Sequence, residues 1–209
     1  MAPVKTLIVT AHPDPASLTA DVARRLAAAL EGTAGAPATP GSPVEIADLA
    51  AEGFDPRGTL ADRHTYRTGT DAPPDVAREQ HRLDGATDVV LVFPVWWWSV
   101  PALLKGWIDR VFVNGWAFTV DPAGGLTRRL GRLTVHLLPV AGDDAGVYDR
   151  HGYREALRTQ LEHGVVDFCG ARRGVTAFVH DSEQEDDAAR ERAVAAAVEA
   201  VRQGVVGDR

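Results

Sequence analysis

VVLVFPVWWWSVPALLKGWIDRV, residues 89–111, is the segment from which the fold of this chain can be read. It opens with a run of apolar residues, Val89 to Phe93, which predicts a buried strand. Pro94 and three consecutive tryptophans then predict a turn, and Pro101 begins a stretch whose apolar residues recur at helical spacing. A strand, a turn and a helix in this order form a β–α unit, and such units bind ligands at the turn that follows the strand.

The same unit recurs along the chain. Strands are predicted at residues 4–10, 44–49, 89–93, 133–140 and 174–180, and helices are predicted to begin near residues 17, 75, 101, 153 and 188. Because the strands are apolar and well separated, we expect parallel pairing with right-handed crossovers. Segment 33–43 is predicted to be a connector, 53–74 a long excursion outside the sheet, and 114–125 and 141–152 loops.

Composition excludes several classes of protein. The formal net charge of −7 argues against non-specific nucleic-acid binding. The one cysteine, Cys169, allows no intrachain disulfide, suits a reducing compartment, and lies in an apolar run that favours burial over reactivity. The N-terminus lacks a signal segment, and no apolar stretch approaches the roughly 20 residues of a membrane span. We therefore expect a cytoplasmic protein without membrane insertion.

Three predicted loops follow strands and should meet at one edge of a parallel sheet. The first, residues 11–19, carries His12, Ser17 and Thr19 before a helix, and a helix N-terminus with hydroxyl groups suits a phosphate. The alternative is that Ser17 or Thr19 only caps the helix and that His12 is a surface residue. The loop lacks both G-x-G-x-x-G and the G-x-x-x-x-G-K-[ST] pattern, which disfavours a Rossmann dinucleotide fold.

The second loop holds Trp96, Trp97 and Trp98. Three consecutive tryptophans cannot all point into a core, and exposed tryptophan usually marks a binding surface. A planar isoalloxazine ring could stack on one of them while backbone N–H groups of the turn bind its carbonyl edge. The alternative is a dimer interface, and both uses are compatible.

The third loop, residues 141–152, carries Tyr148 and His151, which could steady a reduced ring and pass a proton to a quinone oxygen. The alternative is a polar lid in which His151 is a surface or capping residue. The adjacent Asp143 and Asp144 have no accompanying ligand cluster, so no metal is expected. The chain also lacks G-x-S-x-G and an evident cysteine nucleophile, which disfavours a hydrolase.

The run FPVWWWSVPALLKGWIDRVF, residues 93–112, resembles the signature of the NAD(P)H:quinone oxidoreductase (DT-diaphorase) family. That family includes the bacterial modulator-of-drug-activity proteins and the ancillary subunits of potassium-efflux systems. Residues 7–13, 77–83 and 167–170 are similar to other motifs of the family, so the resemblance covers nearly the whole chain. It implies a flavodoxin-like α/β fold: a three-layer sandwich with a five-stranded parallel sheet and helices on both faces. Residues 1–209 would form one domain with an insertion at about 53–74.

The resemblance also implies roles for individual positions. Residues matching the flavin phosphate site are His12, Ser17, Leu18 and Thr19. Residues matching the two ring-binding loops are Pro94, Val95, Trp96, Trp97 and Trp98, and Pro139, Val140, Ala141 and Gly142. Tyr148 and His151 match the pair that assists hydride transfer. Phe118 and Val120 match the lid over the substrate, and Arg190 matches a basic residue near the cofactor in FAD-binding members.

The implied activity is a two-electron, ping-pong reduction of a quinone or similar small acceptor, with NAD(P)H as the hydride donor. FAD is the expected cofactor because the 53–74 insertion is like that of the FAD-binding members, and FMN is the alternative. The family implies a homodimer. The alternative function is that of a regulatory flavoprotein ancillary to a membrane transporter.

Overall fold

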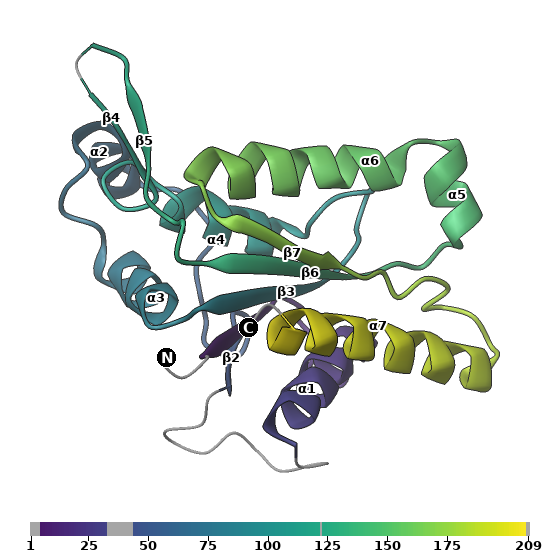
Figure 1. The fold of residues 1–209 in the computed structure, drawn as a ribbon. Coiled ribbons are helices and arrows are strands. Elements are labelled where there is room, and N and C mark those ends of the chain that lie inside the picture. Colours follow the sequence, from purple (N-terminus) through teal and green to yellow (C-terminus); the bar gives the residue numbers. More distant parts are fainter. Residues whose placement is uncertain (1–4, 33–43, 122, 208–209) are drawn as a thin grey trace.

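A computed structural model describes residues 5–32, 44–121 and 123–207 of the chain. The connector predicted at 33–43 lies outside the described residues. Five parallel strands form one sheet in the order β2-β1-β3-β6-β7 (Figure 1). Their bounds are Thr6–Thr10 for β1, Val44–Asp48 for β2, Asp88–Pro94 for β3, Thr134–Val140 for β6 and Arg172–Thr176 for β7. The predicted parallel sheet is confirmed, and its strand order reverses direction at β1 and β3.

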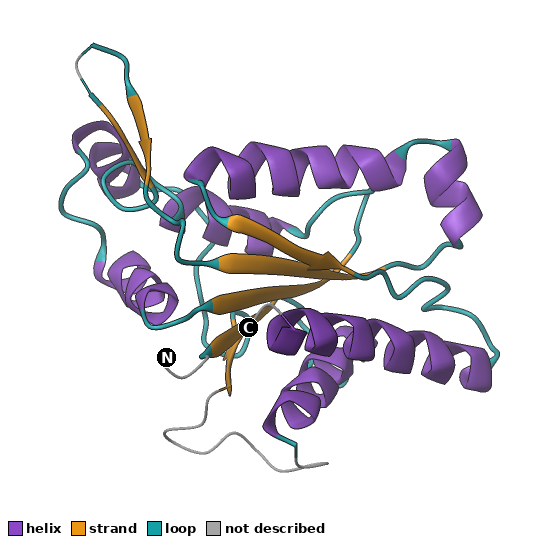
Figure 2. Ribbon diagram, viewed as in Figure 1, coloured by secondary structure: helices purple, strands orange, loops and turns teal. Residues whose placement is uncertain are grey.

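Helices cover both faces of the sheet (Figures 1 and 2). One face packs against α1 (Leu18–Glu31) and α7 (Asp187–Gly207), and the apolar side chains between them form one core. The other face packs against a second core, and its helices are α3 (Pro74–Asp84), α4 (Ala102–Val111) and α6 (Tyr153–Arg158), which continues as the π-helix η1 (Thr159–Asp167). The predicted three-layer α/β sandwich is therefore confirmed.

Three predicted irregular segments contain regular structure. The 53–74 excursion contains helix α2 (Leu60–Thr68), segment 114–125 leads into an antiparallel hairpin of β4 (Phe118–Val120) and β5 (Leu126–Arg128), and segment 141–152 contains α5 (Ala145–Arg150). The prediction was wrong for α2 because this helix buries only Thr65 and so shows no apolar periodicity. Its signal is a capping box, in which Thr59 and Asp62 exchange side-chain and backbone hydrogen bonds.

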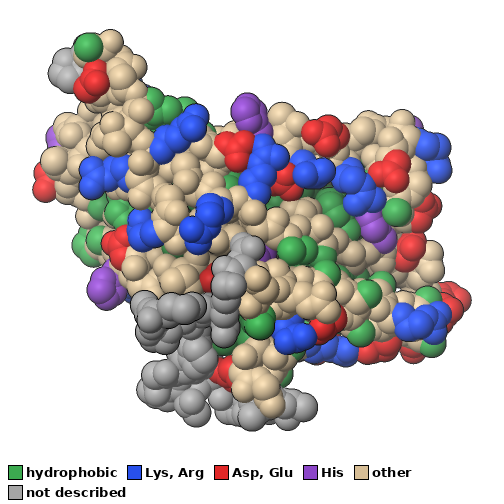
Figure 3. Space-filling model, viewed as in Figure 1, with side chains coloured by type: hydrophobic (Ala, Val, Ile, Leu, Met, Phe, Trp, Pro, Cys, Tyr) green, Lys and Arg blue, Asp and Glu red, His purple; other side chains and the backbone are tan. Residues whose placement is uncertain are grey.

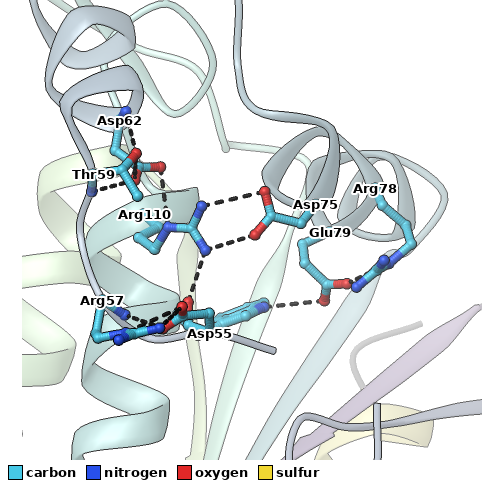
Figure 4. A network of polar contacts seen from close by, with 9 residues as sticks. Asp55, Arg57, Thr59, Asp62, Asp75, Arg78, Glu79 and Arg110 are labelled. Atoms are coloured by element: carbon cyan, nitrogen blue, oxygen red, sulfur yellow. Dashed lines mark hydrogen bonds and ion pairs between the residues drawn. The ribbon is translucent and has the colours of Figure 1, made fainter. Parts of the chain in front are cut away.

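Arg110 of α4 joins the 53–74 segment to the rest of the molecule (Figure 4). Its guanidinium donates to the Asp55 carbonyl at 2.7 Å, to Asp62 at 3.0 Å and to Asp75 at 2.6 Å. Burial on its own would raise the pKa of Asp75, but the hydrogen bonds and charge of Arg110 more than offset it and hold the pKa below its usual range. The 53–74 segment is thus fixed to α3 and α4 by the ion pairs of Arg110.

The surface mixes charges of both signs, as Figure 3 shows over α6 and α7. Among the described helices, none has the length and apolar content needed to cross a membrane. Large exposed apolar side chains concentrate on α2, on the β4–β5 hairpin and at the end of η1, namely Leu60, Tyr66, Val120, Leu126 and Phe168. Ring contacts from Phe118 to both Tyr66 and Phe168 connect these three elements into one surface, which we call the hairpin surface.

Candidate functional site

The loops that follow β1, β3 and β6 meet at the carboxyl edge of the sheet, as predicted. Val95 donates its backbone N–H to the Val140 carbonyl at 2.8 Å, which joins the second loop to the end of β6. The rings of His12 and Trp96 lie edge to face with centroids 5.7 Å apart, which joins the first loop to the second. This is the position where the strand order reverses, and it is where ligands bind in doubly wound sheets.

The first loop presents hydrogen-bond donors. Ser17 is the N-cap of α1 and accepts from the Ala20 N–H at 3.2 Å, while the N–H groups of Leu18 and Thr19 have no acceptor in the described part of the chain. The Nδ1 of His12 lies 3.0 Å from the Asp14 N–H and 3.2 Å from the Asp14 carbonyl oxygen, which fixes the ring against the first loop. Ser17 is therefore a cap, and the free donors around it suit an anion such as a phosphate.

Thr10, the last residue of β1, adds a polar group that the sequence did not predict. Its Oγ1 is the one buried side-chain oxygen or nitrogen without a hydrogen-bond partner among the described residues. Side chains alternate along a strand, so Thr10 faces the same side as Ile8, the side covered by α1. Buried hydroxyls are nearly always partnered, and a phosphate oxygen bound at the α1 N-terminus would supply the missing partner. The available signal was a threonine at the carboxyl end of a strand whose central residues are apolar.

The tryptophan turn is a two-residue hairpin. Trp96 and Ser99 exchange backbone hydrogen bonds of 3.0 and 3.1 Å, and Trp97 and Trp98 both lie in the left-handed region, with φ of 49° and 63°. Asparagine and glycine usually occupy these positions, so a strained backbone holds the two tryptophans. Neither Trp97 nor Trp98 has a backbone N–H acceptor in the described ranges. Trp97 is 93% exposed, and two free N–H groups therefore accompany an open aromatic surface.

A wall of aromatic rings stands beside this turn. Trp98 stacks on Tyr153 with centroids 3.8 Å apart and planes 11° apart, and Tyr153 stacks in turn on the exposed His151 at 5.4 Å. Tyr148 lies beneath, buried, with its ring edge to face with Trp98 at 5.6 Å. The structure thus brings Tyr148 and His151 into the same wall, where the ring of Tyr153 contacts both.

Tyr148 remains a protonated phenol in this setting. Burial, followed by the negative charge of Asp143, raises the pKa of Tyr148 to about 12, against the opposing charge of Arg154. At neutral pH its hydroxyl is therefore available as a hydrogen-bond donor. The neighbouring Asp144 is the N-cap of α5, since it accepts from the Val147 N–H at 2.9 Å. No cluster of three or more metal-ligating side chains occurs among the residues described.

The remaining predicted residues fall into three groups. Pro94, Pro139, Val140 and Ala141 supply backbone at the carboxyl ends of β3 and β6, and an added Cβ on Gly142 would come within 3.3 Å of Glu183. Arg190 lies in the first turn of α7, where it pairs with Asp187 and donates to the Gln184 carbonyl at 2.7 Å. Phe118 and Val120 lie on the hairpin, which Figure 1 shows at the end of the molecule opposite α5. Within one chain they do not reach the three loops.

This donor set fits a flavin. The α1 N-terminus, His12 and Thr10 suit a phosphate group. The free N–H groups of Trp97 and Trp98 suit the carbonyl edge of a planar ring, and the exposed aromatic rings suit its faces. The Oγ1 of Thr10 and the N–H groups of Leu18, Thr19, Trp97 and Trp98 have no partner among the described residues and are therefore free to bind such a group.

Comparisons with known proteins agree with this geometry. The profile of a family described as having a flavodoxin-like fold matches residues 4–204. Ribosyldihydronicotinamide dehydrogenase (quinone) of Pongo abelii is 31% identical over 192 residues, which cover 81% of this chain and 78% of that protein. The structure of an NAD(P)H:quinone oxidoreductase from Methanothermobacter marburgensis superposes with a TM-score of 0.81 at 23% identity, over 97% of each chain.

An FMN-dependent NADH-azoreductase from Bacillus anthracis, solved with FMN, superposes with a TM-score of 0.68 at 16% identity, over 96% of this chain and 98% of the azoreductase. At this identity the likeness shows the fold. The profile match and the relative that is 31% identical are the findings that decide the family. The chain belongs to the flavodoxin-like family that contains the NAD(P)H:quinone oxidoreductases.

Proposed function

We propose that this protein is a flavin-dependent NAD(P)H oxidoreductase that reduces a quinone or similar small acceptor by two electrons. The observation that carries the proposal is the Trp97–Trp98 turn, which has two free N–H groups and an open aromatic surface. This turn lies next to the loop at the α1 N-terminus, whose free donors suit a phosphate. The relative from Pongo abelii, named as a dehydrogenase of ribosyldihydronicotinamide acting on quinone, supports both a nicotinamide donor and a quinone acceptor.

The residues of the chain would bind the flavin, orient its ring and shield it from water. A bound flavin supplies the hydride and electron chemistry. His12 and the N–H groups of Leu18 and Thr19 hold the phosphate, and the turn N–H groups orient the ring. Tyr148 places a protonated phenol beside the ring, where it can stabilise negative charge on an acceptor oxygen.

The test is purification followed by spectroscopy. We expect a yellow protein that bleaches when NADH or NADPH is added without oxygen and regains its colour when a benzoquinone follows. Steady turnover without a second protein supports an enzyme, whereas binding to a transporter without turnover would support the ancillary role. A colourless protein that takes up neither FAD nor FMN would overturn the proposal.

The form of the flavin remains a prediction. The 53–74 insertion favours FAD, and the azoreductase neighbour is named for FMN. Mass spectrometry of the flavin released from the protein decides between the two. We also propose a cytoplasmic location, which is supported by the single cysteine, Cys169, because one cysteine allows no intrachain disulfide and suits a reducing compartment.

We further propose a homodimer formed through the hairpin surface. Leu60 is 87% exposed and Val120 is 52% exposed, and a patch of large apolar side chains of this kind usually marks an interface. In such a dimer the hairpin of one subunit would lie over the site of its partner, which would give Phe118 and Val120 their predicted place in the substrate pocket.

A further inference from the structure

We propose that His180, held by Arg154, is a positioning residue that fixes Tyr148 and the loop after β6 against the flavin. The proposal rests on the proposed function and adds a residue to which the family resemblance assigns no role. The imidazole of His180 packs against Tyr148 with centroids 5.0 Å apart and planes 70° apart. His151, which the resemblance pairs with Tyr148 in hydride transfer, stacks on Tyr153 instead.

Two hydrogen bonds fix the tautomer of His180. Arg154 Nη2 lies 3.3 Å from His180 Nε2, and a guanidinium can only donate, so Nε2 is the acceptor. The other nitrogen, Nδ1, then carries the proton and donates to the Asp143 carbonyl at 3.2 Å. A doubly protonated ring would lose the first bond and bring two positive charges together. The geometry therefore requires a neutral imidazole.

Arg154 connects the elements around this histidine. Its Nε donates to Asp149 at 2.8 Å, and Asp149 is the neighbour of Tyr148 on α5. Its guanidinium lies 5.0 Å from the ring centroid of Phe178, which stacks on His180 with planes 5° apart. Moving Arg154 would consequently disturb both α5 and the segment that follows β7.

The segment beginning at His180 is also bonded to the loop that would hold the flavin ring. The Asp181 N–H donates to the Asp143 carbonyl at 3.2 Å, and the Ser182 N–H donates to the Ala141 carbonyl at 3.0 Å. His180 and these two backbone bonds join the loops after β6 and β7. Tyr148 packs against His180 on one side and against Trp98 on the other.

The charged and titratable groups around His180 explain its protonation. Burial lowers the pKa of His180, the hydrogen bond to Asp143 opposes this, and Arg154 lowers the pKa further. Asp181 and Asp149 act in the opposite direction without reversing the result, and Tyr148 is a neutral phenol. The ring is neutral at pH 7. Acidification below its lowered pKa should protonate it, separate it from Arg154 and loosen Tyr148.

Three substitutions separate these contacts. His180→Asn retains a donor for the Asp143 carbonyl, His180→Gln retains an acceptor for Arg154, and His180→Phe retains only the ring packing. We expect His180→Phe to slow the reduction of quinone by the reduced flavin about 10-fold with little change in the KM of the quinone, because Tyr148, the phenol that would stabilise charge on the acceptor oxygen, has lost its orientation. The rate of the wild type should fall as the pH drops below the pKa of His180, which we call the acid limb, and the rate of His180→Phe should show no such fall. The rates of the Asn and Gln variants should be reduced less than that of His180→Phe. The matched control is His163→Phe, since His163 is exposed on η1 and its bonds are outside this cluster.

Nuclear magnetic resonance on the flavin-free protein tests the pair independently of activity. Imidazole ¹⁵N correlations should show His180 neutral and protonated on Nδ1 at pH 7, and the ring signals of Tyr148 should shift in His180→Phe but not in His163→Phe. A proton on Nε2, or unchanged Tyr148 signals, would overturn the proposal. So would a His180→Phe enzyme that melts earlier but keeps the wild-type rate and acid limb. A colourless wild type would instead refute the proposed function and leave the resonance test to decide on the pair.

Discussion

The unpartnered hydroxyl of Thr10 gives a prediction at the scale of a single residue. Thr10→Val removes a buried oxygen that no described group bonds, so the flavin-free protein should be as stable as the wild type or more stable by about 1 kcal/mol. If that oxygen binds the flavin phosphate, the flavin Kd should rise about 10-fold, corresponding to 1.4 kcal/mol. Urea unfolding of the flavin-free protein and fluorescence titration with FAD and FMN measure the two effects.

Thr134 supplies the matched control. It is equally buried, but its Oγ1 accepts from Arg172 Nε at 3.1 Å. Thr134→Val should therefore lower the free energy of unfolding and leave flavin affinity unchanged. A Thr10→Val protein that is destabilised like Thr134→Val and binds flavin normally would show that Thr10 has no role in the site.

At the scale of elements, a close backbone contact between Gly69 and Gly115 joins the 53–74 segment to the loop before β4. Gly115 has φ of +91°, and a Cβ on it would lie 2.1 Å from the Gly69 carbonyl oxygen. Gly124 has a similar φ of +87°, but a Cβ there meets no atom within 4 Å. Both Gly→Ala changes should cost about 1 kcal/mol because alanine disfavours the left-handed region. Only Gly115→Ala also creates a clash with Gly69, so we expect it to lower the free energy of unfolding by more than Gly124→Ala does. Thermal unfolding of the two variants compares them, and equal losses would contradict the close approach.

Arg110 gives a second prediction for the same segment. Arg110→Met leaves the carboxylates of Asp62 and Asp75 without their partner, and we expect the free energy of unfolding to fall by about 3–5 kcal/mol. Because the folded pKa of Asp75 is lowered, the ion pair contributes fully above the unfolded pKa of about 3.9 and is lost as pH falls through the folded pKa. In urea titrations, the difference in free energy of unfolding between the wild type and Arg110→Met should therefore be smaller at pH 3 than at pH 7.

Arg57 is the control within the same network (Figure 4). Its side chain is 85% exposed and pairs with Asp55 at the surface, where ion pairs contribute little. Arg57→Met should change the urea midpoint by no more than a small fraction of the Arg110→Met effect. Equal effects of the two variants would mean that burial of Arg110 is not what makes its contacts strong.

Elements that bury an apolar run or stripe could be predicted from the sequence, and those stabilised by polar contacts could not. The core strands β3 and β6 are wholly buried, so their apolar runs were visible. Helix α2 is stabilised by the ion pair of Asp62 with Arg110 and by its caps. These contacts produce no apolar periodicity in the sequence, and the capping box is the one local signal of the helix. In the candidate site, Ser17 and the tryptophan turn carry local signals. Tyr153 and His180 pack against Tyr148 only once the chain has folded, so no local sequence pattern could show that they belong to the site.

At the scale of the whole molecule, the hairpin surface and the candidate site lie at opposite ends of one chain (Figure 1). Within one chain the hairpin therefore does not cover the candidate site. A two-fold dimer would bury the apolar side chains and bring each hairpin to the partner's site in a single arrangement, because a self-complementary interface repeats every contact twice. Activity should then depend on association even though the three loops proposed to bind the flavin belong to one chain.

Leu60→Asp combined with Val120→Asp tests this dependence. Both side chains are exposed on the hairpin surface, so the folded monomer should tolerate the change, whereas carboxylates buried at an apolar interface would disfavour the dimer. Sedimentation should show a dimeric wild type and a monomeric variant that still binds flavin but reduces quinone poorly. Val206→Asp, at an exposed apolar residue of α7 that is 38% exposed and outside this surface, should stay dimeric and active. A wild type that sediments as a fully active monomer would mean that the hairpin surface has another partner and that Phe118 and Val120 do not line the substrate pocket.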